Sequence, residues 1–578
     1  MAINGRARRQ LNPCCACDTL RAAVLLEKSE WSGLGNNHRI DIEEYIDMKG
    51  LGSRSIVSVL LLLGWSSTLY SQARQASPGV FKQLDDAVRQ DAQILRGRQL
   101  FIDDDLIESM DGVARTLHQP VKHAANPLVV QDRAWEEGGP GYTTVLYDPQ
   151  ENVFRMWYGY WIEDAKPSEQ VLCYATSRDG IHWEKPVLNE QTGSNKVSIP
   201  RITGFQCAGI FRDPMERNQE KRFKMLFSAA PDGTSQAWAT GAAYSPDGIT
   251  WALEPEFPLI PFSDTQICPF WDPQRGRYVA HLRYGPPNDR IAARIESEDF
   301  VHWSPKVTLF SYRQSRLDRP FQTQHYQMAV APYHGNYIGL MFAYHGETIQ
   351  PIPEDELWRD KSNTQLTYSR NGVTWLRVGH RGAYRPHELV SEGRDWKAES
   401  TQATFIPYGE HGQDWDWGSA YPAYQPVLTE IDDTIYLYYV GTNTRHWASY
   451  HGDKDKKSGI GLATLRADGF VSVEGNGTLT TRPLVFLGDT LLVNADARGG
   501  TLRVEAMDAS GKVIEGFSRN VCTPIVGDSV RHVVTWNENP DCNLIQARPI
   551  RLRFYMENAK IYSFEARIQN KHYIQSYD

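Results

Sequence analysis

Four segments of the chain share a spacing of small, acidic and aromatic residues that is typical of a repeated turn. Each reads Ser, any residue, Asp or Asn, Gly or Phe, two further residues and Trp, at residues 177–183, 245–251, 297–303 and 369–375. In a tight turn Asp or Asn bonds to the nearby backbone, Gly accepts positive φ, and the Trp anchors the strand that follows. A degenerate fifth copy at 465–471 lacks the Trp. The repetition predicts an array of equivalent structural units.

Pairs of short apolar runs precede each of these turns. The clearest pairs are broken by Asp-Pro and lie at 145–158, 210–227 and 269–282, with looser copies at 331–342 and 429–439. Each unit thus contains an apolar strand, a turn, an aromatic strand, a third strand, the Ser-Asp-Gly turn and a fourth strand. Five units of four strands predict a five-bladed β-propeller over residues 126–471.

The pattern changes after the fifth turn. Segments such as 501–506 and 551–557 alternate apolar and polar residues with a period of two, which predicts a C-terminal β-sandwich over residues 472–578. Residues 74–125 form an N-terminal segment leading into the propeller, with one helix expected at 83–95 and a strand at 98–102. The predicted fold class is all-β, a five-bladed β-propeller followed by a β-sandwich.

The N-terminus carries an apolar run at residues 56–65, shorter than the roughly 20 residues that a membrane span needs. Lys49 and Arg54 precede the run and small polar residues follow it up to Ala73, which is the order of a secretory signal peptide. We therefore expect a signal peptide at 48–73 and a mis-assigned or disordered leader at 1–47; an ordered N-terminal extension is the alternative. The mature protein is expected to begin near Arg74, to lack a membrane span, and to be secreted or periplasmic.

Composition and charge narrow the choice of partners. Lys+Arg 61 against Asp+Glu 70 gives a net charge of −9, which has the wrong sign for neutralising phosphates, so nucleic acid is not an expected partner. Of the eight cysteines, Cys522 and Cys542 either close a loop or stay as buried thiols. His-rich zinc patterns and G-x-S-x-G are absent from the sequence, which predicts no metal ligands and no cofactor, with a structural Ca²⁺ left open.

A five-bladed propeller followed by a sandwich resembles glycoside hydrolase families 32 and 43, and the resemblance covers the chain from about residue 98. It implies a secreted glycoside hydrolase that acts on a polysaccharide or oligosaccharide; a glycan-binding propeller without catalysis and a glycan phosphorylase are the alternatives. Of the family 32 acid motifs (W-x-N-D-P, R-D-P and E-C), only R-D-P has a match, at Asp213. Asp213 occupies the same turn position as Asp148 and Asp272, so we predict that it is a turn residue.

Hydrolysis of a glycosidic bond needs two carboxyl groups across the sugar. In a propeller these groups come from different blades, near the start of the innermost strands. Counting back from the Asp-Pro turns gives Asp264, with Glu136 (beside Glu137) and Asp416 (beside Asp414) as the matching acids. Each has a structural alternative: a turn cap for Asp264, a solvated loop for Glu136 and a surface turn for Asp416. The predicted substrate-binding residues are Trp135, Arg319, His325, Trp415 and Trp417, with Asp318 beside Arg319.

Overall fold

The structure is a computed structural model that describes residues 93–568 except 96, 163–164, 231–232, 234–237, 262–263, 286–288, 311–317, 319–321, 380–381, 385–403 and 454. The predicted leader and signal peptide lie outside the described residues. The described chain is all-β, with short helical turns at η1 (Gln219–Lys221), η3 (Glu354–Glu356) and α7 (Ala448–His451).

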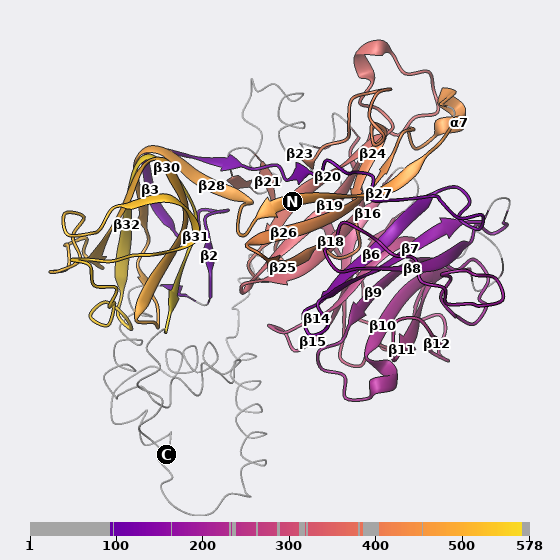
Figure 1. The fold of residues 1–578 in the computed structure, drawn as a ribbon, viewed down its shortest axis with the longest axis horizontal. Coiled ribbons are helices and arrows are strands. Elements are labelled where there is room, and N and C mark those ends of the chain that lie inside the picture. Colours follow the sequence, from indigo (N-terminus) through magenta and orange to yellow (C-terminus); the bar gives the residue numbers. More distant parts are fainter. Residues whose placement is uncertain are drawn as a thin grey trace, which may run out of the picture. The chain divides into compact units, whose positions relative to one another are not determined.

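Three antiparallel sheets follow one another along the first half of the described chain (Figure 1). The first contains β6 (Pro140–Asp148), β7 (Val153–Trp161) and β8 (Gln170–Ser177). The second contains β9 (Gln206–Arg212), β10 (Phe223–Ala229), β11 (Ala239–Ser245), β12 (Ala252–Leu253) and β13 (Ile260–Pro261). The third contains β14 (Asp264–Asp272), β15 (Arg277–Tyr284), β16 (Ile291–Ser297) and β17 (Val307–Phe310). Each sheet begins at one of the predicted units.

The next two units share one twelve-stranded sheet. Its first part contains β18 (Gln324–Tyr333), β19 (Asn336–His345), β20 (Lys361–Ser369), β21 (Leu376–Gly379), β22 (Gly382–Tyr384) and β23 (Thr404–Ile406). Its second part contains β24 (Ser419–Pro422), β25 (Val427–Ile431), β26 (Thr434–Thr442) and β27 (Ser458–Arg466). One parallel pair, Ser362 with Ser419, joins the two parts.

Two short strands that precede β6 in the sequence complete this sheet. β4 (Val121–Lys122) and β5 (Val129–Val130) pair antiparallel with β27, in register Ala463 with Lys122 and Ile460 with Val129. Residues that precede the first unit in sequence therefore supply the edge strands of the last one.

The Ser-Asp-Gly turns form as predicted. In the second copy Ser245 Oγ accepts a hydrogen bond from the backbone N–H of Gly248 (2.8 Å), and Asp247 Oδ1 accepts one from that of Ile249 (2.8 Å). The Trp251 indole donates back to the Gly248 carbonyl at 3.1 Å. The backbone contacts recur in the other three copies, and in the third Phe300 takes the position of Gly with φ +70.

The Asp-Pro turns also share one geometry, and they confirm that Asp213 is a turn residue. Its Oδ1 accepts the backbone N–H two residues on at 2.9 Å, as Asp148 and Asp272 do at 3.0 Å. The following sheet bonds to these carboxylates as well: Tyr278 donates to Asp213 at 2.7 Å and Tyr337 to Asp272 at 2.8 Å. The turns thus connect neighbouring sheets.

A separate eight-stranded sheet combines both ends of the described chain. It contains β1 (Gln93–Ile94), β2 (Gln99–Leu100), β3 (Ile107–Leu117), β28 (Val471–Thr481), β29 (Leu484–Val485), β30 (Thr490–Asp508), β31 (Ile525–Val533) and β32 (Ile550–Arg567). Register shifts interrupt the pairing of the two longest strands, β30 and β32, and bulges of this kind bend a sheet. One core of aliphatic and aromatic side chains is buried within it.

The strand β1 bears on the helix that the sequence predicted at residues 83–95. Gln93–Ile94 is a strand paired with β29, so the end of the helix expected at 83–95 is wrong, because tertiary pairing overrides a local helical pattern. Residues 83–92 lie outside the described residues.

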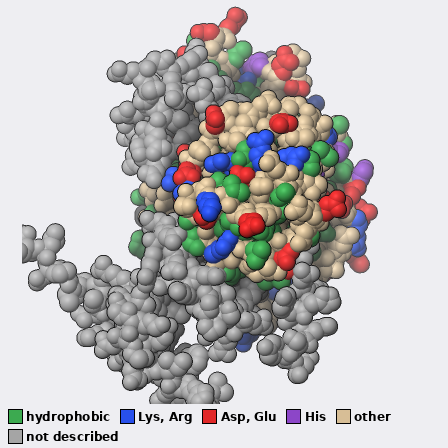
Figure 2. All heavy atoms as spheres, turned by 90° about the vertical axis from the view of Figure 1, so that its left-hand side faces the viewer, with side chains coloured by type: hydrophobic (Ala, Val, Ile, Leu, Met, Phe, Trp, Pro, Cys, Tyr) green, Lys and Arg blue, Asp and Glu red, His purple; other side chains and the backbone are tan. Residues whose placement is uncertain are grey.

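Cys522 and Cys542 are buried free thiols. Within the described chain, no helix has the length and apolar character to cross a membrane. Figure 2 shows acidic and basic side chains interspersed over the described part of one face.

Candidate functional site

The first strands of four successive units are irregular close to their starts. The register shifts between Gly141 and Thr143 in β6, opposite Leu226 and Ser228 in β9, between Asp264 and Cys268 in β14, and between His325 and Gln327 in β18. Bulges re-aim side chains and are common beside active sites. The same irregularity in four strands directs attention to this end of the sheets.

Two residues at these bulges have strained backbones. Tyr142 has φ +34 and Cys207 has φ +58, a region that residues other than Gly rarely adopt. Both lie six residues before their turn aspartates, Asp148 and Asp213. Strain of this kind persists where the surroundings enforce it, and it concentrates at functional sites.

Aromatic rings connect the strand starts to one another. The Tyr142 ring lies 5.8 Å from that of Tyr421 in β24, which stacks on Phe342 at 4.7 Å. Phe342 in turn stacks on Tyr326 in β18 at 4.8 Å. Burial raises the pKa of both Tyr142 and Tyr421, so their hydroxyls stay protonated near neutral pH.

Cationic side chains surround Tyr326. The guanidinium carbons of Arg283 and Arg290 lie 4.4 and 4.8 Å from the centre of its ring. Its hydroxyl is 3.0 Å from Nε2 of His446. We call Tyr142, Tyr326, Tyr421, Arg283, Arg290 and His446 the entrance cluster.

His446 is exposed as a whole residue, but its imidazole packs against the rings of Tyr326, Tyr344 and Trp447, with ring centres 5.7, 4.9 and 5.3 Å away. Burial, followed by the nearby charge of Arg290, lowers the pKa of His446 to about 4. The imidazole is therefore neutral near pH 7 and can accept a proton on Nε2 from Tyr326.

Glu347 is a carboxylate that contacts the entrance cluster directly. It accepts hydrogen bonds from Arg290 (2.8 Å), Gln324 (2.8 Å) and the Trp447 indole (3.3 Å). Burial alone would raise its pKa, but the hydrogen bonds from Arg290 and Gln324 lower it, so Glu347 is ionised.

Asp264 begins β14, and its backbone is in register with Arg283 of the entrance cluster. Its main chain is thus at this end of the third sheet, where the sequence predicted it. Its side chain lies outside what the structure describes.

Glu136, the second predicted acid, is completely buried. Lys185 Nζ bonds to its carboxylate at 2.8 Å, the Tyr158 hydroxyl donates to it at 3.1 Å, and the backbone N–H of Asp132 donates at 3.0 Å. Its neighbour Trp135 is half-buried and donates from the indole to Asn195 at 3.1 Å. These contacts are those of an ion pair inside the fold rather than of a solvated loop.

Asp416, the third predicted acid, is also buried and belongs to a different group of contacts. Lys122 Nζ lies 2.6 Å from its Oδ2, and the Tyr439 hydroxyl donates to the same oxygen at 3.0 Å. Trp415 packs against Tyr439 with ring centres 5.7 Å apart. Trp417 is 8% exposed and lies 5.0 Å from Lys361 Nζ. Glu136 and Asp416 therefore lie in separate hydrogen-bond groups, each with its own lysine.

The predicted residues of the fourth unit form a buried ionic group. His325 Nε2 is 3.1 Å from Asp318, and Arg377 donates to the same carboxylate at 2.6 Å. Although burial alone would raise the pKa of Asp318, these two neighbours lower it below the ordinary carboxyl range. Arg319 lies outside the described residues.

None of the residues of the entrance cluster was among the acids, tryptophans, Arg319 and His325 that the sequence predicted for the site. For Tyr142 the sequence does carry a signal, since it lies six residues before the turn aspartate Asp148. Arg283, Arg290 and His446 have no such signal, since they come from later strands and loops.

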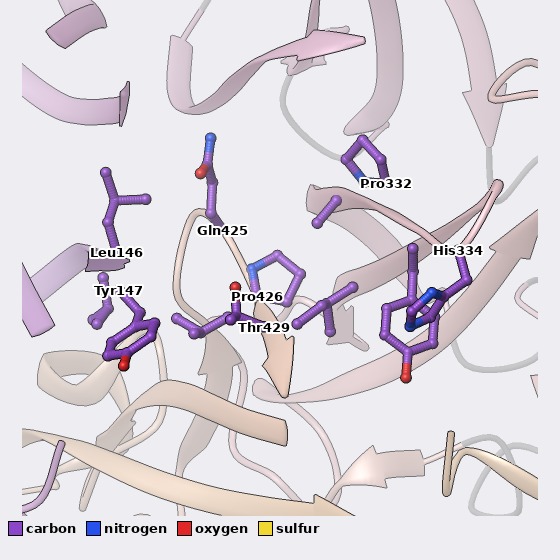
Figure 3. A pocket seen from close by; sticks show the side chains of 12 residues that line it. Leu146, Tyr147, Pro332, His334, Gln425, Pro426 and Thr429 are labelled. Atoms are coloured by element: carbon purple, nitrogen blue, oxygen red, sulfur yellow. The ribbon is translucent and has the colours of Figure 1, made fainter. Parts of the chain in front are cut away.

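A separate cavity of about 330 Å³ lies at the opposite ends of β6 and β18, where residues such as Leu146, Tyr147, Pro332 and His334 line it (Figure 3). Near it, His334, Glu430 and Asp468 bring possible metal-ligand atoms within 4.8 Å of one another. The Arg98 guanidinium bonds to both carboxylates, at 3.0 Å to Asp468. This acid pair thus holds an arginine.

No family model matches the chain. Two curated relatives, the uncharacterized proteins MT1551 and Rv1502 of two Mycobacterium tuberculosis strains, are each 32% identical to it over 115 residues, which is 19% of this chain and 32% of each relative. The chain thus spans about a third of the length of these relatives.

Solved structures with a similar fold include an N-acetylgalactosamine deacetylase from F. plautii in complex with blood group B trisaccharide, at 13% identity and a TM-score of 0.39 over 62% of this chain and 97% of that one. A glycosyl hydrolase from Bacteroides ovatus has 13% identity and a TM-score of 0.38 over 63% and 99% of the two chains. The β-1,2-mannobiose phosphorylase from Listeria innocua has 11% identity and a TM-score of 0.36 over 60% and 96%. The solved structures that the chain resembles are thus glycan-acting enzymes.

Proposed function

We propose that this protein is a secreted enzyme that cleaves glycosidic bonds in a polysaccharide or oligosaccharide at the entrance cluster. The observation that carries the proposal is the convergence of bulged strands, two of them with strained residues, on a group of aromatic rings, guanidinium groups and an imidazole. Aromatic faces stack on sugar rings, and the polar groups bond to hydroxyls.

The proposal includes an arrangement of the sheets. The five units act as blades around an axis, closed by β4 and β5 on β27, with the eight-stranded sheet as the appended sandwich. The innermost strand of each blade is then β6, β9, β14, β18 or β24, and the entrance cluster lies at one mouth of the axis. The pairing of N-terminal strands with the last unit supports this closure.

Among the predicted acids we retain Asp264 as the proton donor to the leaving sugar. Its strand start is in register with Arg283, whereas Glu136 and Asp416 are buried with a lysine each. Glu347 is ionised, and its oxygens bond to Arg290, Gln324 and Trp447, so we assign it to holding Arg290.

A glycan phosphorylase is the second candidate, and the cations favour it. The positive charges of Arg290, Arg283 and Lys456 all lower the pKa of His446, which shows that three cations lie around this imidazole. Cations of this kind can bind a phosphate ion. The test is to incubate the protein with a panel of polysaccharides and to measure new reducing ends, with and without inorganic phosphate. Release without phosphate supports hydrolysis, phosphate-dependent sugar phosphate supports phosphorolysis, and binding without either product indicates a glycan-binding protein.

The site assignment is tested by two matched substitutions. Asp264→Asn is expected to lower turnover at least about a hundredfold with little change in Tm, because the amide keeps the shape but cannot donate a proton as the acid does. Asp213→Asn is the control: it is expected to lower Tm modestly and to spare turnover, because Asp213 holds a turn and Tyr278. Loss of activity in a well-folded Asp213→Asn variant would show that the R-D-P acid is catalytic.

A further inference from the structure

The hydroxyl of Tyr326 has the surroundings of an activated nucleophile. A nucleophile of this kind is recognised by a base within hydrogen-bond reach and by a further group that orients the base. Tyr326 Oη is 3.0 Å from His446 Nε2. The backbone N–H of His446 donates to the Asp360 carbonyl at 3.0 Å, and the rings of Tyr344 and Trp447 lie 4.9 and 5.3 Å from the imidazole.

Two cationic groups flank the ring of Tyr326. Arg283 and Arg290 flank the Tyr326 ring at 4.4 and 4.8 Å, and Glu347 fixes the orientation of Arg290 at 2.8 Å. A negative charge that develops on Oη is stabilised by two guanidinium groups already in place. His446 is neutral in the resting site, so Nε2 has an electron pair that can take the proton; because its pKa is lowered it is a weak base, and the proton moves as the bond from Oη to the sugar forms.

The described carboxylates nearby have other partners. Glu347 has three hydrogen-bond donors, and Asp360, which is fully buried, accepts from the Tyr344 hydroxyl and from the backbone N–H of Trp447 at 2.7 Å. Tyr326 itself is at the bulge of β18 and is 5% exposed, next to the exposed His446. It therefore joins the strand bulge, the base and the solvent-facing side of the site.

We propose that Tyr326 is the nucleophile of the reaction and that His446 is its base, an inference that rests on the proposed glycosidase function. In the first step Tyr326 Oη bonds to the anomeric carbon as the bond from that carbon to the leaving oxygen breaks. The Tyr326 proton passes to His446 Nε2, and Asp264 protonates the leaving oxygen. In the second step water adds to the anomeric carbon and gives its proton to Asp264, while the bond to Oη breaks and Tyr326 recovers its proton from His446. The net change is hydrolysis with retention, with Tyr326 in the place of the second carboxyl group.

A sugar-independent test uses N-acetylimidazole, which transfers an acetyl group to a tyrosine oxygen with loss of imidazole. The full-length protein is treated near pH 7, digested, and followed by mass spectrometry. Tyr326 is expected to be acetylated at least ten times faster than Tyr284, although Tyr284 is 41% exposed and Tyr326 only 5%. Tyr284 is the internal control, since its ring lies 4.8 Å from Lys306 Nζ rather than beside an imidazole. Equal or slower labelling of Tyr326 in the wild-type protein overturns the proposal without any variant.

His446→Gln then separates the base from the setting. Glutamine keeps a hydrogen-bonding group near Tyr326 but is not a base, so labelling of Tyr326 should fall at least tenfold while that of Tyr284 stays unchanged. Labelling of Tyr326 that does not depend on His446 contradicts the role of His446. A protein that labels rapidly at Tyr326 but cleaves no glycan contradicts the proposed function and leaves the activated tyrosine standing. An active glycosidase whose Tyr326→Phe variant keeps its turnover contradicts the nucleophile alone.

Discussion

His345 illustrates how one buried side chain links the fold to pH. It is almost completely buried in β19, with Nδ1 2.9 Å from the Thr323 hydroxyl and Nε2 3.1 Å from Asn363 Oδ1. A neutral ring satisfies both contacts, since Nε2–H donates to the amide oxygen and Nδ1 accepts from the hydroxyl. Burial lowers the pKa of His345 to about 4, below its ordinary value of 6.5.

This shift predicts a loss of stability in mild acid. The unfolded chain binds a proton at His345 below pH 6.5 while the folded protein does not until about pH 4, so the free energy of unfolding falls across that interval. The contribution is about 3 kcal/mol from a shift of this size. Urea titrations from pH 7 to 4 should show the stability difference between the wild-type protein and His345→Gln shrinking by about this amount. A difference that does not vary with pH would contradict a neutral buried His345.

The role of a turn residue is easier to predict from the sequence than the role of a residue in the candidate site. A turn aspartate such as Asp213 accepts a hydrogen bond from the backbone two residues away, so the neighbouring residues in the sequence are enough to predict its role. The contacts of Glu136 with Lys185 and of Asp416 with Lys122 cross 49 and 294 positions. Both were predicted as catalytic acids from their place relative to the repeated turns, and that place does not show that a distant lysine pairs with each of them.

At the scale of strands, the repeated turns made the order of the units predictable from the sequence. Each Ser-Asp-Gly turn is closed by its own side chains, as at Ser245 and Asp247, so no distant residue is needed to specify it. The pairing of β4 and β5 with β27, and of β3 with β28, was not foreseen. The strands β4 and β5 have two residues each, which is too few for a recognisable periodicity, and the partners of all three strands are set by tertiary packing.

Two neighbouring sheets approach closely where β9 meets β14. A Cβ on Gly209 would lie 1.8 Å from the carbonyl oxygen of Ile267, so only glycine fits. Gly209→Ala is expected to lower the free energy of unfolding by at least about 2 kcal/mol, because the clash is with backbone that cannot rotate away. Gly141→Ala is the control, since its Cβ would meet the Tyr421 hydroxyl at an ordinary 3.5 Å. Chemical denaturation of the two variants measures the difference, and equal stabilities would mean that the strands are not packed as closely as described.

At the scale of the whole molecule, one ionic group ties distant parts of the chain together. Asp468, in the degenerate fifth turn, accepts hydrogen bonds from Arg98 at 3.0 Å, from Tyr333 at 2.7 Å and from Asn494 at 3.2 Å. Arg98 precedes the first unit, Tyr333 ends β18, and Asn494 belongs to β30 of the eight-stranded sheet. The fifth turn thus lacks the tryptophan of the other copies, and its Asp468 forms a junction between these three parts of the chain.

This junction predicts that the eight-stranded sheet cannot be removed cleanly. Deletion of residues 472–578 removes most of β28, the partner of β3, and exposes the core buried within that sheet. We expect the truncated protein to aggregate, as measured by size-exclusion chromatography and light scattering. A soluble, monomeric fragment that unfolds cooperatively would show that the sheet is an independent appendage.

The pairing of β4 and β5 with β27 also affects how the chain folds while it is being translated. Asn126 donates to the Leu462 carbonyl across 336 positions of sequence. At roughly 5 to 20 residues per second, the ribosome needs about 20 to 70 seconds to deliver the second half of this contact. During that time the first strands that leave the ribosome have unpaired edges. We therefore expect folding of this chain to depend on chaperones that cover these edges until β27 has been translated.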